Sequence, residues 1–494
     1  MGTGFDHEKY VSMQSEHIRE RFERFGGKLY LEFGGKLFDD YHASRVLPGF
    51  QPDSKVQMLR TLKDQAEIVI VINAADIEKN KLRGDLGITY DADLLRLIDS
   101  FREIDMLVGS VVLTRYTQQP SADAFKRYLE EQGVAVYLHY PIEGYPSDVE
   151  HIVSEQGYGK NEYIKTSRPL VVVTAPGPGS GKMATCLSQL YHEHQRGIRA
   201  GYAKFETFPI WNLPLRHPVN IAYEAATADL NDVNMIDSFH LEAYGETAVN
   251  YNRDIEIFPV VNEMFNRIWG KSPYQSPTDM GVNMVGQCIS DDAIVRRAAE
   301  DEIIRRFYQA MCAARQGSVP AVDEVSKLKL LMSQAGITQQ NRPVIAAALE
   351  REQQTGAPAA AMELPDGTII TGKTSQLLGA SSALLLNALK VLGGIPDCVH
   401  LISPTIIEPI QHLKLEHMGN KNPRLHTDEV LIALSICAVT DDDAERAMAQ
   451  IERLKNLEVH SSVILSGVDE RVFKNLGVNL TCEPKYQTQN LYHK

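Results

Sequence analysis

The sequence predicts an α/β protein built from more than one domain. Near-continuous apolar runs recur through the first 180 residues, and segments with helical periodicity lie between them. The chain has 494 residues, which is more than the roughly 250 to 300 residues at which one hydrophobic core stops growing. With 44% hydrophobic and 23% charged residues, the composition is that of a folded, globular chain.

The apolar runs predict parallel strands, because strands buried on both faces lack the alternation of half-exposed ones. Helical segments separate the runs, which favours a doubly wound sheet with right-handed crossovers. The predicted strands cover residues 67–73, 110–116, 134–140 and 169–174, and the predicted helices cover 91–103, 121–132 and 147–156.

Ligands of such sheets bind outside the carboxyl ends of the strands. Applied to these runs, that rule selects Asn73, Asp76, Arg115, His139 and the loop after Thr174 as candidates for lining a site.

Beyond residue 250 the pattern changes twice. It becomes helical at 257–269 and 290–314, and after a soft segment at 353–360 it returns to mixed α/β character. We therefore expect three domains: an N-terminal α/β domain at 1–250, a helical domain at 251–352 and a C-terminal three-layer α/β domain at 353–494. The last should contain a hairpin at 361–371, helices at 380–392, 427–438 and 442–454, and strands near 399–402 and 462–465.

The segment VVVTAPGPGSGK, residues 171–182, is the sharpest local signal. A buried strand that breaks into glycines and then begins a helix presents backbone N–H groups and the positive end of the helix dipole to an anion, and a lysine adds a point charge. We expect Gly177, Gly179, Ser180, Gly181 and Lys182 to bind phosphate. The alternative is a glycine-rich connection that binds no ligand.

This loop departs from the usual pattern G-x-x-x-x-G-K-[ST] at two positions. Pro176 stands in place of the first glycine, and Met183 in place of the hydroxyl residue that ordinarily holds magnesium. Thr185 could supply that hydroxyl only by an unusual geometry. Anion binding is therefore better supported than nucleotide hydrolysis.

With the following segment GIRAGYAK, which ends at Lys204, the loop resembles the start of the P-loop group that includes dethiobiotin synthetase and CTP synthase. The resemblance implies ATP and Mg²⁺ as cofactors, a catalytic role for Lys204 beside Lys182, and acidic metal ligands downstream. The downstream candidates are Glu206, Glu224, Asp229, Asp232 and Asp237, each of which is also explained as a surface carboxylate.

The hairpin MELPDGTIITG and the small-residue helix after it resemble the cytidine deaminases in topology. Deaminase zinc requires His-x-Glu or Cys-x-Glu at the helix start and Pro-Cys-x-x-Cys later. Here the helix starts Ala-Ser-Ser-Ala at 380–383, and the segment Pro-Asp-Cys-Val-His at 396–400 has the wrong spacing, so no zinc is expected. His412, His417 and His426 receive no role.

Over nearly its whole length the chain resembles a bacterial family known as domain of unknown function 1846. The segments that carry the resemblance are TAPGPGSGKMATCLSQLYHEH, EAATADLNDVNMIDSFHLEAYGETAVNYNRDIE and NLGVNLTCEPKYQTQNLYHK. The resemblance implies a cytosolic protein with an α/β part, a helical part and a deaminase-like C-terminal part, and it assigns no functional residues.

Charge and hydropathy narrow the expected partners. The net charge is −14 and no basic stripe is interleaved with aromatics, so nucleic acid is not expected as a partner. No apolar run could span a bilayer and the first residues lack signal-peptide character, so we expect a cytoplasmic protein without membrane contact.

The six scattered cysteines indicate reduced thiols. Long apolar helices favour a homo-oligomer, and the expected partner is a small phosphorylated ligand.

Two hypotheses follow. In the first, the protein is an ATP-dependent ligase or small-molecule kinase in which Lys182 and Lys204 stabilise the transferring group. In the second, it is a non-catalytic ligand-sensing or oligomeric structural protein with a degenerate phosphate loop. Magnesium dependence separates the two.

Overall fold

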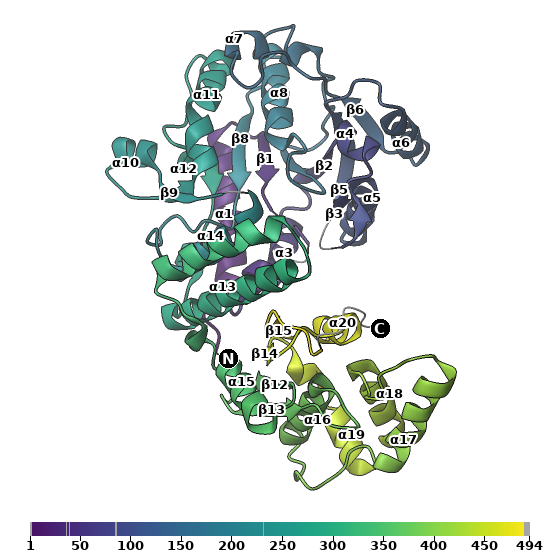
Figure 1. The fold of residues 1–494 in the computed structure, drawn as a ribbon. Coiled ribbons are helices and arrows are strands. Elements are labelled where there is room, and N and C mark those ends of the chain that lie inside the picture. The colour runs from purple at the N-terminus through teal and green to yellow at the C-terminus, as the bar shows by residue number, and fades with distance from the viewer. Residues whose placement is uncertain (1, 36, 39, 84–85, 231, 489–494) are drawn as a thin grey trace. The chain divides into compact units, whose positions relative to one another are not determined.

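The computed structural model describes residues 2–35, 37–38, 40–83, 86–230 and 232–488 and divides into two compact units (Figure 1). The N-terminal unit comprises Thr3–Glu224 and Asp232–Val295, and the C-terminal unit comprises Ala225–Asn231 and Arg296–Lys494. The segment 251–352, expected as a helical domain of its own, is thus divided between the two units.

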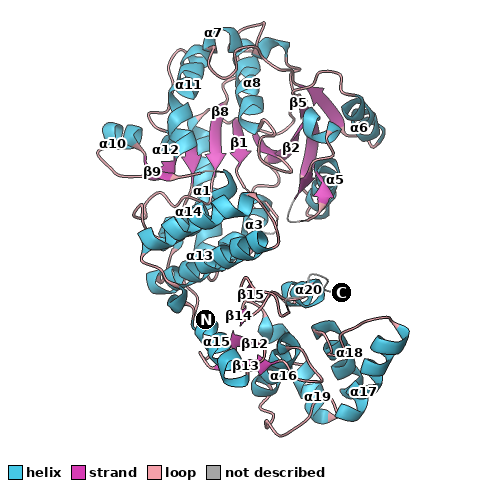
Figure 2. Ribbon diagram, viewed as in Figure 1, coloured by secondary structure: helices cyan, strands magenta, loops and turns pink. Residues whose placement is uncertain are grey.

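The N-terminal unit contains a seven-stranded parallel sheet, so the predicted α/β class with a mostly parallel sheet is confirmed (Figure 2). The strand order is β11-β8-β1-β7-β2-β5-β6. The strands are β1 Leu29–Phe33, β2 Ala66–Asn73, β5 Leu107–Thr114, β6 Ala135–Leu138, β7 Leu170–Thr174, β8 Gly201–Phe205 and β11 Gly281–Val282.

Twelve helices accompany this sheet in the part of the chain that the structure describes. They are α1 His7–Arg24, α2 Tyr41–Val46, α3 Ser54–Arg60, α4 Ala74–Glu78, α5 Tyr90–Glu103, α6 Pro120–Glu131, α7 Val149–Ile152, α8 Lys182–Gln195, α9 Pro218–Ala226, α10 Ser238–Tyr244, α11 Asn252–Trp269 and α12 Pro277–Met280. Two small hairpins, β3 Leu82–Arg83 with β4 Ile88–Thr89 and β9 Asn234–Ile236 with β10 Val249–Tyr251, lie outside the large sheet.

Strand β1, like β8 and β11, lies outside the four apolar runs that predicted strands of this sheet. All five of its residues are buried, and it pairs in parallel with β7 on one side and β8 on the other. The rings of Phe33 and Phe205 stack with their centroids 4.2 Å apart, which joins β1 to β8. Because β7 lies between β1 and β2, the chain reverses direction across the sheet here, and ligands of open α/β sheets bind at such a switch point.

The C-terminal unit contains a four-stranded mixed sheet in the order β13-β12-β14-β15. Strand β12 is antiparallel to both neighbours, and β14 is parallel to β15. The strands are β12 Ala359–Glu363, β13 Ile369–Lys373, β14 Glu458–Ser461 and β15 Asn479–Cys482. The helices are α13 Asp292–Arg315, α14 Pro320–Ala335, α15 Pro343–Thr355, α16 Ala380–Leu392, α17 Pro404–His412, α18 Thr427–Cys437, α19 Asp442–Met448 and α20 Gly467–Asn475.

The predicted hairpin and the helices at 380–392 and 427–438 are confirmed in this unit, but both predicted strands are wrong. Residues 399–402 form a loop that buries Leu401 and Ile402 in the core without strand pairing. The strand predicted near 462–465 is found just before those residues, at Glu458–Ser461, where Glu458 and His460 are buried polar residues. An apolar pattern therefore did not mark that strand.

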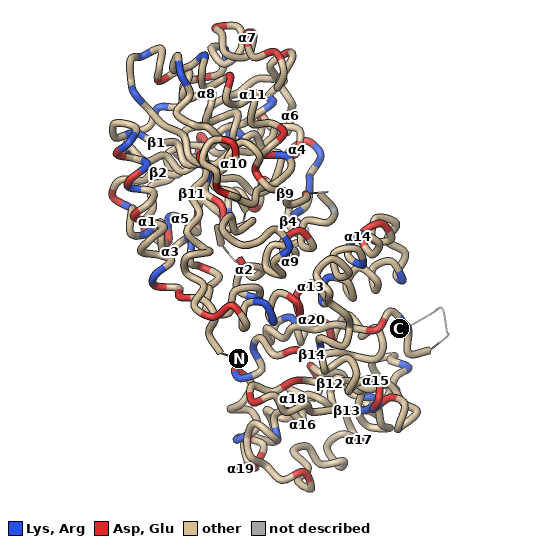
Figure 3. The backbone as a smooth tube through the Cα atoms, turned by 90° about the vertical axis from the view of Figure 1, so that its left-hand side faces the viewer, with Lys and Arg blue, Asp and Glu red and all other residues tan. Residues whose placement is uncertain are grey.

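Lysine and arginine occur among aspartate and glutamate along the chain (Figure 3). Among the described residues, no helix combines the length and the apolar character that a bilayer crossing requires.

Candidate phosphate-binding site

A cavity of about 550 Å³ opens at the carboxyl ends of the parallel strands, beside the loop between β7 and α8. Side chains from four strand ends and the start of α8 line it. They are Glu32, Thr114, Arg115, His139, Tyr140, Pro141, Ile142, Tyr145, Tyr158, Asn161, Gly179, Ser180, Gly181, Lys182, Met183, Ala184 and Thr185. The expected edge of the sheet thus carries the cavity.

The loop after β7 is held in a conformation that requires glycine at two positions. Gly179 and Gly181 have φ angles of +74° and +95°, in the left-handed region. Gly181 is also the N-cap residue of α8, and a Cβ atom there would lie 3.2 Å from Cγ2 of Thr114. Thr114 Oγ1 donates a hydrogen bond of 2.5 Å to the Ser180 carbonyl and so ties the loop to β5. The start of α8 is therefore fixed at the cavity wall.

Two hydroxyl groups in this wall are buried without a partner. Ser180 is 3% exposed and Thr185 is fully buried, and their side-chain oxygens form no hydrogen bond with any described residue. Buried polar atoms in proteins nearly always have a partner. Both residues line the cavity, so a polar group placed there would supply the missing partners.

Two cationic side chains face the same cavity. Burial lowers the pKa of Lys182, and the attraction of Glu32 opposes that shift. Arg115 extends from the end of β5, where its own φ of +52° turns the chain. Within the described ranges, neither Lys182 nor Arg115 forms an ion pair with an acidic side chain. Both charges remain available to an anionic ligand.

Glu32, from strand β1, is the carboxylate of the cavity. It is buried and accepts a hydrogen bond of 2.7 Å from the Tyr202 hydroxyl. Burial, followed by the nearby Glu32 charge, raises the pKa of Tyr145, while Arg115 lowers it. Tyr145 is therefore close to an acidic and a basic group in the same cavity.

His139 is present as a neutral imidazole. It is 3% exposed, and burial lowers its pKa to about 4. Its Nε2 lies 3.2 Å from the Glu162 carbonyl oxygen, which can only accept, so Nε2 carries the proton. The Nδ1 atom is then an acceptor.

The structure does not bring Lys204 or Glu206 to the wall of this cavity. Lys204 forms an ion pair of 2.6 Å with Glu206 and a second, closer one with Asp254 of α11. Burial by itself lowers the pKa of Lys204, but Asp254 and Glu206 together raise it above its ordinary value, whereas burial raises the pKa of Glu206 to about 7. The geometry of Lys204 is that of a neutralised cation joining β8 to α11.

Asn73 and Asp237 lie at helix starts. The Asn73 side chain accepts a hydrogen bond of 2.9 Å from the Ala75 backbone at the start of α4. Asp237 caps α10 and also accepts 2.7 Å from the Thr278 hydroxyl. Neither residue lines the cavity.

The remaining predicted positions also lie elsewhere. Asp232 pairs with Arg253 at 2.6 Å. Asp229 belongs to the short helix Ala228–Leu230 of the C-terminal unit, and its side chain is outside what the structure describes. Gly177 packs against Tyr90, whose ring would overlap any Cβ atom at that position.

The cavity is lined by Arg115, His139 and the glycine loop, which the strand-end rule selected, but the polar residues that the rule missed include Glu32, Tyr145, Tyr158 and Asn161. Glu32 belongs to β1, a strand that the apolar runs did not predict. The other three follow β6 in segments without strand or helix periodicity. Their signal was weak: a tyrosine- and proline-rich stretch after a predicted strand.

Comparison with known proteins places the whole chain in one family. The N-terminal model of the domain of unknown function DUF1846 matches residues 3–336, and the C-terminal model of the same family matches residues 340–492. A UPF0371 protein of Streptococcus thermophilus is 57% identical over 490 residues, which cover 99% of both chains. A UPF0371 protein of Streptococcus pyogenes serotype M5 is 58% identical with the same coverage. The chain therefore belongs to the DUF1846 family.

Proposed function

We propose that this protein binds a small phosphate-bearing ligand in the cavity between Glu32 and the start of α8. The observation that carries the proposal is the pair of unpartnered hydroxyls at that helix end, those of Ser180 and Thr185, beside Lys182 in the cavity wall. A phosphate accepts hydrogen bonds from all three and is stabilised further by the positive end of the helix dipole. If the loop bound no ligand, these buried hydroxyls would stay without a hydrogen-bond partner, which is rare in proteins.

The rest of the cavity suits the remainder of such a ligand. Its volume of about 550 Å³ matches the cavities that hold small molecules. Arg115 offers a second anchor for an anionic group, while Tyr140 and Tyr145 provide apolar ring surface with hydroxyl groups. A ligand with a phosphate at one end and a polar body at the other would use all of these.

The catalytic form of this proposal is an ATP-dependent ligase or kinase that acts on a small molecule. Lys182 would stabilise the charge of the transferring phosphoryl group, and Glu32 is the carboxylate in the cavity that fits a magnesium ion. Lys204 would act indirectly, by holding β8 against α11.

The second candidate is a non-catalytic, ligand-sensing protein, and Met183 favours it. This thioether occupies the position where a metal-binding hydroxyl is usual, and it lines the cavity. A homo-oligomer, a cytoplasmic location and a deaminase-like C-terminal topology remain predictions in either case.

The test is a thermal-shift screen of the full-length chain with ATP, GTP, pyrophosphate and sugar phosphates, each with and without magnesium. Lys182→Ala is the informative variant. Lys63→Ala is the control, because Lys63 is exposed and precedes β2 at the opposite edge of the sheet. A ligand at about 100 times its dissociation constant should stabilise the folded state by about 2.7 kcal/mol.

A shift that requires both Lys182 and magnesium would support the ATP-dependent enzyme. A shift that requires Lys182 but survives magnesium removal would support the ligand sensor. If no phosphate compound shifts wild type, or if Lys182→Ala shifts as much as Lys63→Ala, the phosphate site is wrong.

A further inference from the structure

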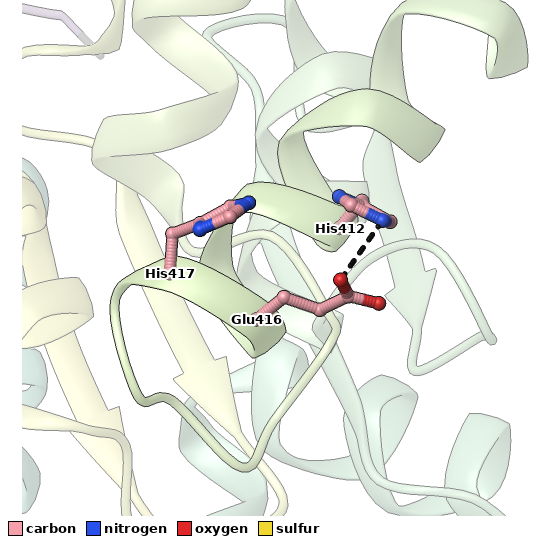
Figure 4. Close-up of side chains that lie close together, drawn as sticks. All are labelled: His412, Glu416 and His417. Atoms are coloured by element: carbon pink, nitrogen blue, oxygen red, sulfur yellow. Dashed lines mark ion pairs between the residues drawn. The ribbon is translucent and has the colours of Figure 1, made fainter.

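A second group of side chains with ligand chemistry lies in the C-terminal unit, at the end of α17 (Figure 4). One ligand atom from each of His412, Glu416 and His417 lies within 4.8 Å of the other two. His412 Nε2 and Glu416 Oε2 are 3.2 Å apart, and the two imidazole rings have centroids 6.0 Å apart. All three residues are exposed.

A π-helical turn brings the three together. Residues Leu413–His417 form this turn, and the Met418 backbone N–H donates 3.1 Å to the Leu413 carbonyl, five residues earlier. In an ordinary α-helix the fifth residue after His412 would point about 140° away from it. In a π turn the fourth and fifth residues both return to the side of the first. Glu416 and His417 can therefore approach His412 from the same short segment.

The turn is anchored from its buried side. Lys414 is 2% exposed, and its ammonium donates 2.7 Å to the Arg424 carbonyl and pairs with Glu429 at 2.7 Å. Ile407, five residues before His412 in α17, lies in the core of the unit. The backbone that carries the cluster is thus fixed by contacts that do not involve the three exposed side chains.

We propose that His412, Glu416 and His417 together bind one divalent transition-metal ion of the zinc class. Zinc takes nitrogen and oxygen ligands at roughly 2.0 to 2.2 Å, so the ligand atoms of a tetrahedral site lie about 3.3 Å apart. The His412–Glu416 pair already has that spacing, and a ligand atom of the exposed His417 lies within 4.8 Å of both partners, from where it would move inward to close the site. Three protein ligands leave a coordination position open to water.

Two imidazoles distinguish this site from the one proposed for magnesium. Magnesium and calcium prefer oxygen ligands, whereas imidazole nitrogen suits zinc, nickel and copper. The residues also differ from the positions at which a deaminase holds zinc, at the start of α16 and after residue 395. The proposal is therefore independent of both the phosphate cavity and any deaminase chemistry.

The experiment uses the full-length, metal-free protein and two probes. Zinc binding is measured by competition with a chromophoric chelator, and the ligand set is identified from the visible spectrum of the cobalt(II)-substituted protein. The variants are His412→Ala, Glu416→Gln and His417→Ala, with His194→Ala as the control because it removes an exposed histidine of α8. Circular dichroism checks that each variant is folded, which is expected because the three side chains are exposed.

The proposal predicts one zinc ion per chain in wild type and in the control. Loss of either cluster histidine should weaken binding by more than about tenfold, with a smaller loss for Glu416→Gln. No binding to wild type, or equal binding to wild type and the His412 and His417 variants, would overturn it. A thiolate-to-cobalt charge-transfer band would also overturn it, because the ion would then sit on a cysteine such as the exposed Cys398.

Discussion

Replacing Lys182 with methionine should change two measured quantities in opposite directions. Burial lowers the pKa of this lysine, so its charged form is held in the cavity wall at a desolvation cost, without an ion pair among the described residues. Methionine has a similar length and no charge. In the absence of ligand, Lys182→Met should therefore have a higher free energy of unfolding than wild type.

The effect on ligand binding has the opposite sign. A hydrogen bond between a charged donor and phosphate contributes about 1.5 to 3 kcal/mol, which corresponds to roughly 10- to 150-fold in affinity. At a ligand concentration of about 100 times the wild-type dissociation constant, the ligand stabilises wild type by about 2.7 kcal/mol. The same concentration should stabilise Lys182→Met by only about 0.3 to 1.4 kcal/mol.

Urea unfolding followed by tryptophan fluorescence measures both effects. The two tryptophans of the chain, Trp211 and Trp269, lie in the N-terminal unit, so their signal reports on the unit that holds the cavity. The measurement is made without ligand and with whichever phosphate compound binds wild type, and Lys63→Met is the matched control. A lower free energy of unfolding for unliganded Lys182→Met would refute the reasoning, because attraction to Glu32 would then outweigh burial.

Three further predictions concern other features. His139 has a pKa of about 4 in the folded protein and an ordinary value of 6.5, so the unfolded chain binds a proton first as the pH falls. The free energy of unfolding should therefore decrease as the pH falls from about 6.5 to 4. If a His139→Gln variant keeps this pH dependence in tryptophan-monitored unfolding, the assignment is contradicted. Gly181→Ala should destabilise the N-terminal unit by at least about 1 kcal/mol, because the φ of Gly181 is +95° and the new methyl group meets Thr114. The thermal shift caused by phosphate compounds should also become smaller. An unchanged urea midpoint would argue against that loop geometry. Arg342→Met should destabilise the C-terminal unit by about 3 to 5 kcal/mol, because it leaves Glu458 buried without the guanidinium that lies 2.7 Å away. Unfolding followed by circular dichroism should show this loss of stability, while unfolding followed by tryptophan fluorescence stays unchanged. Equal changes in both signals would disprove a local effect.

The sequence predicted the strands that contain a long uninterrupted apolar run. Strand β2, with the sequence AEIVIVIN, and strand β7, with LVVVT, have consecutive apolar side chains that cover both faces, and that pattern is visible without a structure. Strand β1, with LYLEF, is as deeply buried, but Glu32 ends its apolar run after three residues, so no strand was predicted there. Strand β14 was missed for a similar reason, because Glu458 is buried against an arginine distant in sequence.

The residues of the candidate site were likewise predictable only where the signal is local in the sequence. The glycine loop and Arg115 were predictable because strand ends and helix starts leave local signals in sequence. Lys204 was expected beside the phosphates, but it pairs with Glu206, just after β8, and with Asp254 of α11, 50 residues later, and nothing local indicates the second pairing. Charge compensation between distant segments is the information that a single sequence lacks.

The position of β1 in the sheet has a consequence for biosynthesis. Leu31 of β1 pairs with Val172 of β7, so the strand leaves the ribosome about 140 residues before its nearer neighbour in the chain. At 5 to 20 residues per second, that interval is roughly 7 to 28 s. Strands β2 and β5 are close in sequence and can pair during this time, while the apolar side chains of β1 have no sheet to join. The burial of β1 between β7 and β8 therefore has to wait until β7 and the glycine loop after it have been synthesised.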